Sequence, residues 1–310
     1  MHSLVQRLFG RLYNAPYLLL VLTTLFWAGN INVGRYAAGY VPPVALGTLR
    51  WVGAALILLP FALPYLRADW PVIRKHAAML TLLSLLSISA YNTLTYYGLQ
   101  FTEAINAVIL QSTGSLVVVA FAFLLFGERL GPWQLFGMIL SFAGVAVVVS
   151  RGESAALLDF RLNIGDLILL AAIASYSLYT VLLRRRPPIH PLSFVTLTMG
   201  WGAILLLPFW AAEIAGGRTV PLEAASLAIV AYVIIFPSLL AHFFFFRGVE
   251  MIGANRAAPF MYLIPVFATA LAILFLGEEL HLFHAAGFML VIGGVLIATR
   301  RQQLPAEVKT

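Results

Sequence analysis

Ser238 and His242 stand four residues apart in an apolar stretch, so one face of a helix would bring a hydroxyl and an imidazole together. Such a pair is the minimum for a nucleophile and its base. The chain offers nothing to complete it, since it has no HExxH motif, no GxSxG motif, no cysteine and no paired carboxylates inside an apolar stretch. We therefore predict no catalytic residue and no enzyme, and an enzyme that works within the membrane is a distant alternative.

Metal ligands are equally scarce. One group of residues could suggest a metal site by its spacing: Glu278, Glu279, His281 and His284. Such a group is more typical of a polar cap at a membrane surface, and the lack of cysteine excludes thiolate ligands and disulfides. We predict neither a metal nor an organic cofactor.

The composition is that of a membrane protein. Of 310 residues, 62% are hydrophobic and 10% are charged, and the mean hydropathy is +0.95, whereas about 25% charged residues is usual in soluble domains. A helix that crosses a bilayer needs about 20 apolar residues. Ten such segments lie near 16–34, 44–66, 77–97, 104–125, 133–150, 164–183, 191–212, 224–246, 257–276 and 283–299. The predicted fold class is an all-α integral membrane protein with ten transmembrane helices and no separate soluble domain.

The basic residues indicate orientation in the bilayer and no nucleic-acid partner. The net charge is +7, but Lys and Arg occur singly or in threes between apolar segments. Assigned to the nearer side of the predicted membrane, 14 of the 19 basic residues fall on one side and 5 on the other. Because cytoplasmic loops retain positive charge, we predict that both termini are cytoplasmic.

The two halves of the chain repeat each other. A shift of 150 residues aligns residues 98–147 with 248–297 without a gap and gives 13 identities in 50 positions. Each half holds five predicted spans, an odd number, so the second copy must be inverted relative to the first. We predict repeats at 16–150 and 164–299, a linker at 151–163, and tails at 1–15 and 300–310. Inverted repeats are typical of transporters with a substrate site between the copies.

Small residues line the last span of each half. They are Gly137, Ser141 and Gly144 in the first copy and Gly287, Gly293 and Gly294 in the second. Such stripes let helices approach closely. We predict that they pack the two halves together in a monomer, with a homodimer as the alternative.

Four short motifs carry a family resemblance. In chain order they are Phe26-Trp27-Ala28-Gly29-Asn30, Arg50-Trp51, Tyr97-Gly98-Leu99 and Phe126-Gly127-Glu128-Arg129-Leu130. With them the chain resembles the drug/metabolite transporter superfamily, in its ten-span branch with two EamA domains, and within that branch it is similar to bacterial aromatic amino-acid exporters of the YddG type.

The resemblance implies a function. A secondary transporter in a bacterial inner membrane would export aromatic and other neutral amino acids, and related metabolites, by alternating access through a cavity between the repeats. The linker at 151–163 would then be periplasmic. An exporter of drugs or other small metabolites is the alternative, and a passive channel is disfavoured because the polar residues form no charged ring.

Polar side chains inside apolar segments are candidates for the substrate path, because an unpaired polar group is costly in hydrocarbon. Their alternative role is to hydrogen-bond between packed helices. The residues predicted to bind substrate are Asn30, Asn92, Tyr96, Gln111, Tyr176, Tyr179, His242 and Tyr262. Their rings and amides suit a flat, partly apolar zwitterion.

Arg50 lies about six residues inside the second predicted span. It has two interpretations that the sequence leaves open. Its guanidinium could bind a substrate carboxylate, or its long side chain could reach out to the outer interface of the membrane.

Prolines and glycines mark the predicted gates and turns. Pro237, Pro259 and Pro265 interrupt the eighth and ninth spans, which favours the second half as the moving part. Gly127-Glu128 and Gly277-Glu278 occupy equivalent turns, where glycine ends one helix and the carboxylate favours the start of the next. No Asp or Glu falls in the middle of a span, which favours facilitated passage over proton antiport, although His242 could titrate.

Overall fold

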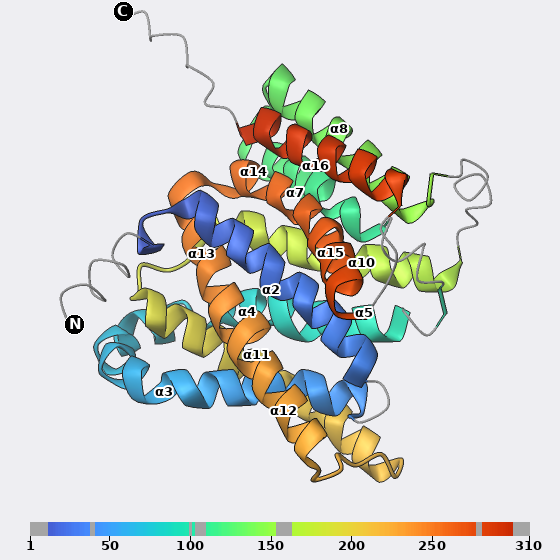
Figure 1. Cartoon of the computed structure of the whole chain (residues 1–310). Helices are drawn as coiled ribbons and strands as arrows, with labels where there is room; N and C mark the ends of the chain where they lie inside the picture. Colours follow the sequence, from blue (N-terminus) through green and yellow to red (C-terminus); the bar gives the residue numbers. More distant parts are fainter. Residues whose placement is uncertain are drawn as a thin grey trace, which may run out of the picture.

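Long apolar helices make up the described part of the chain. The computed structural model describes residues 12–37, 41–98, 101–102, 110–152, 163–276 and 281–299, and these contain helices and no strand (Figure 1). The first half holds α2 (Pro16–Ala37), α3 (Pro43–Lys75), α4 (Ala77–Ser84), η1 (Leu85–Ala90), α5 (Tyr91–Gly98), α7 (Gly114–Phe126) and α8 (Pro132–Val149). The second half holds α10 (Ile164–Leu182), η2 (Leu183–Arg185), α11 (Pro191–Ala215), α12 (Ala224–Val233), η3 (Ile234–Leu240), α13 (Ala241–Ile252), α14 (Ala254–Ala257), η4 (Ala258–Tyr262), α15 (Leu263–Leu276) and α16 (Leu282–Thr299).

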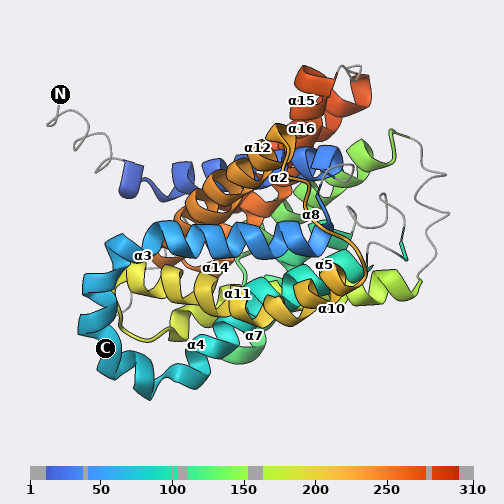
Figure 2. The ribbon, with the colours of Figure 1, turned by 90° about the horizontal axis from the view of Figure 1, so that it is seen from below.

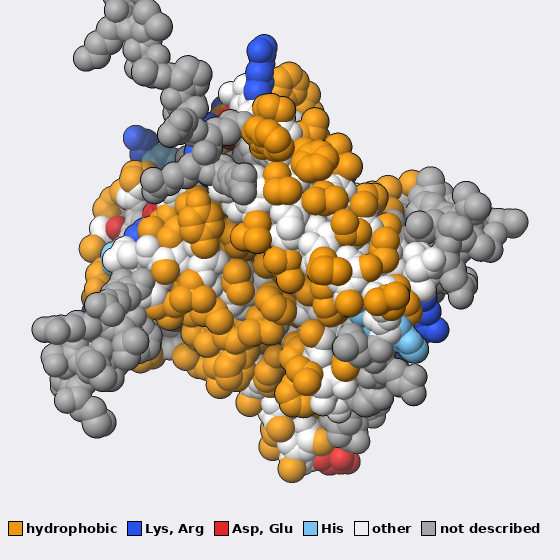
Figure 3. All heavy atoms as spheres, turned by 45° about the horizontal axis from the view of Figure 1, so that its top comes forward, with side chains coloured by type: hydrophobic (Ala, Val, Ile, Leu, Met, Phe, Trp, Pro, Cys, Tyr) orange, Lys and Arg blue, Asp and Glu red, His pale blue; other side chains and the backbone are white. Residues whose placement is uncertain are grey.

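The helices are those of a multi-pass membrane protein. Eight are long and apolar enough to cross a bilayer, and two shorter apolar helices, Pro16–Asn30 and Leu110–Phe126, stand where the first and fourth spans were predicted. Figure 3 shows hydrophobic side chains over most of one face of the molecule. Large side chains that would be costly in water are exposed, among them Leu124, Leu274, Phe275 and Met289. This surface suits contact with lipid tails.

Local signals explain where helices begin and end. Pro43, Pro132 and Pro191 each open a helix at a position that needs no backbone N–H. Gly127 ends α7 in the left-handed conformation with φ of 66°, as predicted for a glycine cap. Asn163 and Asp166 form a reciprocal capping box at the start of α10.

The packing of the helices relates the two halves by a two-fold exchange. α3 packs on α11 and α8 packs on α16, and each of these pairs joins equivalent spans of the two repeats (Figures 1 and 2). α2 packs on α13 and α15, and its equivalent α10 packs on α5 and α7. Each contact thus has a counterpart in which the equivalent helices of the two halves change places. This symmetry confirms the prediction of two repeats and agrees with their inverted arrangement.

Glycines bring α8 and α16 into close antiparallel contact. A side chain at Gly137 would collide with the carbonyl oxygen of Gly294, and one at Gly144 would lie 2.7 Å from the carbonyl oxygen of Gly287. Between these crossings, Ser141 Oγ donates a hydrogen bond of 3.2 Å to the carbonyl of Val291. Five of the six predicted small residues therefore join the two halves, and Gly293 is the exception, because a β-carbon there meets nothing within 4 Å.

Both repeats carry a π-helical turn at the same place. η1 interrupts the third span and η3 interrupts the eighth, and Ser87 in η1 is equivalent to Pro237 in η3 at the 150-residue shift. Prolines were predicted to loosen the eighth and ninth helices, and that prediction was incomplete, because the third helix also widens, with no proline. Ser87 Oγ donates to the carbonyl of Leu83 at 2.7 Å, so a side chain partly satisfies the loosened backbone.

The helix α3 is longer than the predicted span at 44–66, because it runs to Lys75. The charged residues between the predicted spans 44–66 and 77–97 thus continue the helix beyond the apolar segment. Asp69 in this extension accepts the backbone N–H of His190, next to the start of α11, at 2.9 Å. At the other end of the pair, Glu213 in α11 accepts the backbone N–H groups of Val44 and Ala45 at 3.2 and 2.7 Å. α3 and α11 thus cap each other across the repeats.

Charged side chains connect the loops at one end of the bundle, which we call the basic end. It contains the connections at 76, 127–131, 186–190 and 253. Glu128 pairs with Arg184 and also accepts a 2.7 Å hydrogen bond from Asn255 Nδ2. Glu250 pairs with Arg186 and with Arg247. Glu128 was predicted to favour the start of the next helix, whereas its carboxylate joins the two repeats.

Candidate functional site

Aromatic and polar side chains from five spans meet midway along the bundle. We call this group the central cluster: Trp27, Arg50, Trp51, Tyr91, Tyr176, Ser238, His242 and Phe245. The ring centroids of Trp51 and His242 are 4.7 Å apart, and those of Tyr91 and Tyr176 are 5.0 Å apart. Both repeats contribute, so a motion between them would change the shape of the cluster.

Arg50 is buried within the cluster, with 6% of its surface exposed. Its Nε donates a 2.8 Å hydrogen bond to Ser238 Oγ, and its guanidinium carbon lies 4.5 Å from the centre of the Trp51 ring. Burying a guanidinium is costly unless hydrogen bonds and charge partners compensate it. The side chain therefore does not reach out to the membrane interface, and a cation lies beside the aromatic rings.

Several buried donors and acceptors in the central cluster meet no partner among the described residues. They are Trp51 Nε1, Tyr176 Oη and both ring nitrogens of His242. Leaving a polar group unsatisfied costs about 1–3 kcal/mol, so protein interiors rarely keep several together. Their grouping around rings and a cation is what a site for a polar, partly aromatic ligand requires.

Ser238 and His242 do not form the hydroxyl–imidazole pair that their spacing allowed. Ser238 Oγ donates to the carbonyl of Val233 at 2.6 Å and accepts from Arg50, and neither His242 nitrogen is hydrogen-bonded to it. A serine nucleophile needs its base within hydrogen-bond reach. The pair therefore has no catalytic geometry.

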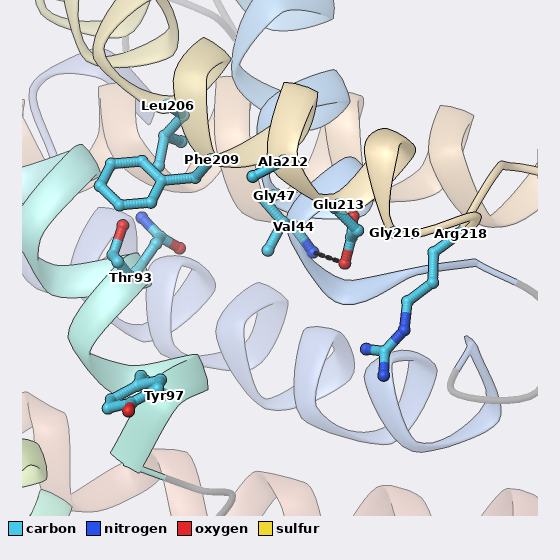
Figure 4. Close-up of a pocket in the computed structure, with 11 residues that line it drawn as sticks. Val44, Gly47, Thr93, Tyr97, Leu206, Phe209, Ala212, Glu213, Gly216 and Arg218 are labelled. Atoms are coloured by element: carbon cyan, nitrogen blue, oxygen red, sulfur yellow. Dashed lines mark hydrogen bonds between the residues drawn. The ribbon is translucent and has the colours of Figure 1, made fainter.

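A pocket of about 440 Å³ lies between α3, α5 and α11, toward the end of the bundle opposite the basic end. We call it the outer pocket. Its lining includes Asn92, Tyr97, Phe209, Glu213 and Arg218, and Figure 4 shows the last four of these. Gly47 in its wall is one helical turn from Arg50, and Asn92 follows Tyr91 in sequence. The outer pocket thus adjoins the central cluster.

The predicted substrate-binding residues fall into separate groups. Tyr176 and His242 lie in the central cluster, and Tyr179 is buried beside it, with its ring 5.5 Å from that of Tyr176. Asn92 lines the outer pocket and donates from Nδ2 to the carbonyl of Ile88 at 2.5 Å.

The other predicted residues lie away from the cluster. Asn30 in α2 and Gln111, just before α7, are half-buried outside the central cluster and the outer pocket. Tyr262 is buried in η4. Tyr96 lies in α5, but its side chain is outside the description.

The predicted gating residues lie at irregular points of the backbone. Pro237 is inside η3, and its carbonyl accepts a 3.1 Å hydrogen bond from Trp27 Nε1. Pro259 is in the 3₁₀ turn η4, and Pro265 is in α15 just after it. Gly277 and Glu278 lie outside the described residues.

Sequence reasoning missed Trp27, Trp51, Ser238 and Phe245 as neighbours of the substrate candidates. Trp51 adjoins the arginine that was singled out, so an aromatic–cation pair within a span was an available signal. Ser238 was considered only as a nucleophile. Its hydrogen bond to a residue 188 positions away depends on how the repeats pack, which no local pattern reports.

Comparison with known proteins now gives the family. The sequence profile of the EamA-like transporter family matches residues 14–150 and 163–300. The chain belongs to this family. The two matched segments correspond to the two repeats, and the EamA-like chain is accordingly a transporter and not an enzyme.

Proteins named as transporters are similar to this EamA-like protein over most of their length. The transporter YyaM of Bacillus subtilis is 26% identical over 293 residues, which cover 93% of this chain and 95% of that protein. A transporter of Archaeoglobus fulgidus is 29% identical, with 92% and 98% covered. A probable terminal-alkyne amino-acid exporter of Streptantibioticus cattleyicolor is 27% identical, with 91% and 92% covered.

The crystal structure of another protein has the same fold as this chain. It matches with a TM-score of 0.75 at 21% sequence identity, over 92% of this chain and 96% of that chain. At this identity the match supports the arrangement of the helices and says nothing about substrate.

Proposed function

We propose that this EamA-like transporter is a secondary carrier that exports aromatic and other neutral amino acids. The observation that carries the proposal is Arg50, a buried cation beside aromatic rings and unpartnered polar atoms. A guanidinium favours a carboxylate, the rings of Trp51 and Tyr176 favour a flat apolar side chain, and His242 adds polar atoms. An aromatic amino acid carries both a carboxylate and a flat apolar side chain, so it matches this set of protein groups.

The relative from Streptantibioticus cattleyicolor supports the same substrate class, because its name is that of a probable amino-acid exporter. The support is limited to the class, since the two chains are 27% identical.

The proposed mechanism is alternating access. The outer pocket opens on one side of the central cluster, while ion pairs of Glu128 and Glu250 hold the basic end together. Motion of one repeat against the other would break the Glu128–Arg184 pair, which joins the two repeats, and open the basic end. With positive loops in the cytoplasm, the basic end faces inward, both termini are cytoplasmic, and the membrane is the bacterial inner membrane.

We further propose that passage is facilitated and not coupled to protons. Asp166 is the buried carboxylate that the described part of the chain places in a span, and it lies at the start of α10 where it accepts from Thr102 Oγ1 and the backbone of Asn163. Its role there is to cap a helix, whereas a proton-coupling carboxylate would be expected at the substrate site.

The test uses the whole protein in liposomes that are preloaded with labelled tryptophan or, separately, threonine. We expect efflux that is the same with and without an imposed pH gradient. Arg50→Gln should lose at least ten-fold in efflux, Arg50→Lys should retain part of it, and Arg67→Gln, an exposed arginine of the same helix, should match wild type. If neither amino acid moves, or if Arg50→Gln transports normally, the proposed substrate class is wrong.

A further inference from the structure

The outer pocket shares no lining residue with the central cluster, and its mainly apolar lining includes the polar side chains of Asn92, Glu213 and Arg218. α3 and α5 from the first repeat and α11 from the second form its walls (Figure 4). Its volume of about 440 Å³ falls in the range of roughly 300–1,000 Å³ that is usual for small-molecule sites. It lies toward the end of the bundle opposite the basic end.

Two residues of opposite charge, Glu213 and Arg218, line this pocket one turn apart. The backbone N–H of Arg218 donates a 3.2 Å hydrogen bond to the carbonyl of Glu213, so the two residues are neighbours across one turn. Their side chains form no ion pair with each other. The carboxylate of Glu213 points to the start of α3, where it accepts from Val44 and Ala45 (Figure 4).

The guanidinium of Arg218 makes no hydrogen bond or ion pair with any described residue. Figure 4 shows it at one side of the pocket and Tyr97 at the opposite side, with Glu213 on the wall above. The ring of Phe209 and the amide of Asn92 complete the lining. The pocket thus presents an anion, a cation and two aromatic rings to one small volume.

We propose that the outer pocket is a second binding site for a small zwitterion. The ligand would place its ammonium toward Glu213, its anionic group toward Arg218, and its side chain against Tyr97 and Phe209. This inference rests on the proposed function, because the zwitterion would be the exported amino acid, held after it leaves the central cluster and before it leaves the protein.

The geometry favours adjacent charges on the ligand. A free amino acid carries its ammonium and carboxylate on one carbon, so it can bridge two side chains whose backbones are one turn apart. The headgroup of phosphatidylethanolamine carries a similar pair of charges and is the competing source of this chemistry. The experiment must therefore separate the two.

The test counts bound tryptophan per protein at equilibrium, with the full chain in lipid-free detergent micelles. Wild type should bind two molecules. Arg218→Gln and Arg50→Gln should each bind one, because each removes one carboxylate partner. Arg151→Gln is the matched control, since Arg151 is an exposed arginine that follows α8 and lies outside the pocket lining, and it should bind two.

Three results would overturn the inference. If wild type binds one tryptophan and only Arg50→Gln abolishes this binding, the protein has the central site and no outer site. If added phosphatidylethanolamine removes one of two bound tryptophans, the pocket belongs to a lipid headgroup. If wild type binds none, the proposed function fails together with this inference.

Discussion

Ser238 accepts a 2.8 Å hydrogen bond from Arg50 Nε and donates one of 2.6 Å to the carbonyl of Val233, five residues earlier in the eighth span. This short chain of bonds connects the buried cation of the first repeat to the π-helical turn η3 of the second. A π turn leaves carbonyls without their usual i+4 partner, and the serine satisfies one of them. The position of Arg50 and the conformation of η3 are therefore coupled.

Ser238→Ala tests this coupling. The variant deprives Arg50 of a partner, and hydrogen bonds to charged groups contribute about 1.5–3 kcal/mol. We expect a lower thermal stability in detergent and weaker tryptophan binding, by about ten-fold or more for a loss of roughly 1.4 kcal/mol. The matched control is Ser193→Ala, because Ser193 is buried and its hydroxyl meets no partner among the described residues. Equal behaviour of the two variants would show that the bond to Arg50 contributes nothing.

His242→Phe separates function from stability. Phenylalanine keeps a ring against Trp51, 4.7 Å away in the native protein, and removes both ring nitrogens. Because those nitrogens meet no described partner, their removal should leave the melting temperature unchanged or raise it. Efflux of tryptophan should fall by at least ten-fold if the nitrogens bind substrate. If the variant has a lower melting temperature and transports tryptophan normally, His242 is a structural residue instead.

The fold could be predicted from the sequence because it depends on local sequence patterns that recur in both halves of the chain. Apolar segments of membrane length, the odd number of spans per half and the shared Gly-Glu turn together predict inverted repeats. The glycine stripes predict the contact of α8 with α16, since only small residues permit such an approach.

The site was harder to predict because it depends on which faces of the helices pack against one another. Tyr176 and His242 were expected in it, whereas Asn30 and Gln111 lie elsewhere, although all four are polar residues in apolar segments. The rotation of each helix about its axis decides between these cases. That rotation is set by contacts such as Arg50 with Ser238 between distant parts of the chain.

Gly294→Val tests the contact between the two repeats. A side chain here would collide with the carbonyl oxygen of Gly137 and with Ser141 Oγ in α8. Overpacking of this kind costs roughly 1–3 kcal/mol or more, so we expect a lower melting temperature and a lower yield of folded protein. Gly293→Val is the control, because a β-carbon at Gly293 meets nothing within 4 Å. If both variants are equally stable, the α8–α16 contact does not hold the repeats together.

The absence of cysteine makes the proposed orientation directly measurable, since a single introduced thiol has no background. Glu223→Cys places a thiol at the start of α12, at the end opposite the basic end, and Lys75→Cys places one at the basic end. Both positions are exposed. In right-side-out membrane vesicles, a membrane-impermeant maleimide should label E223C at once and K75C only after lysis, because positive loops stay in the cytoplasm. The reverse pattern would place the basic end outside, and the outer pocket would then open to the cytoplasm as an entry site instead of an exit site.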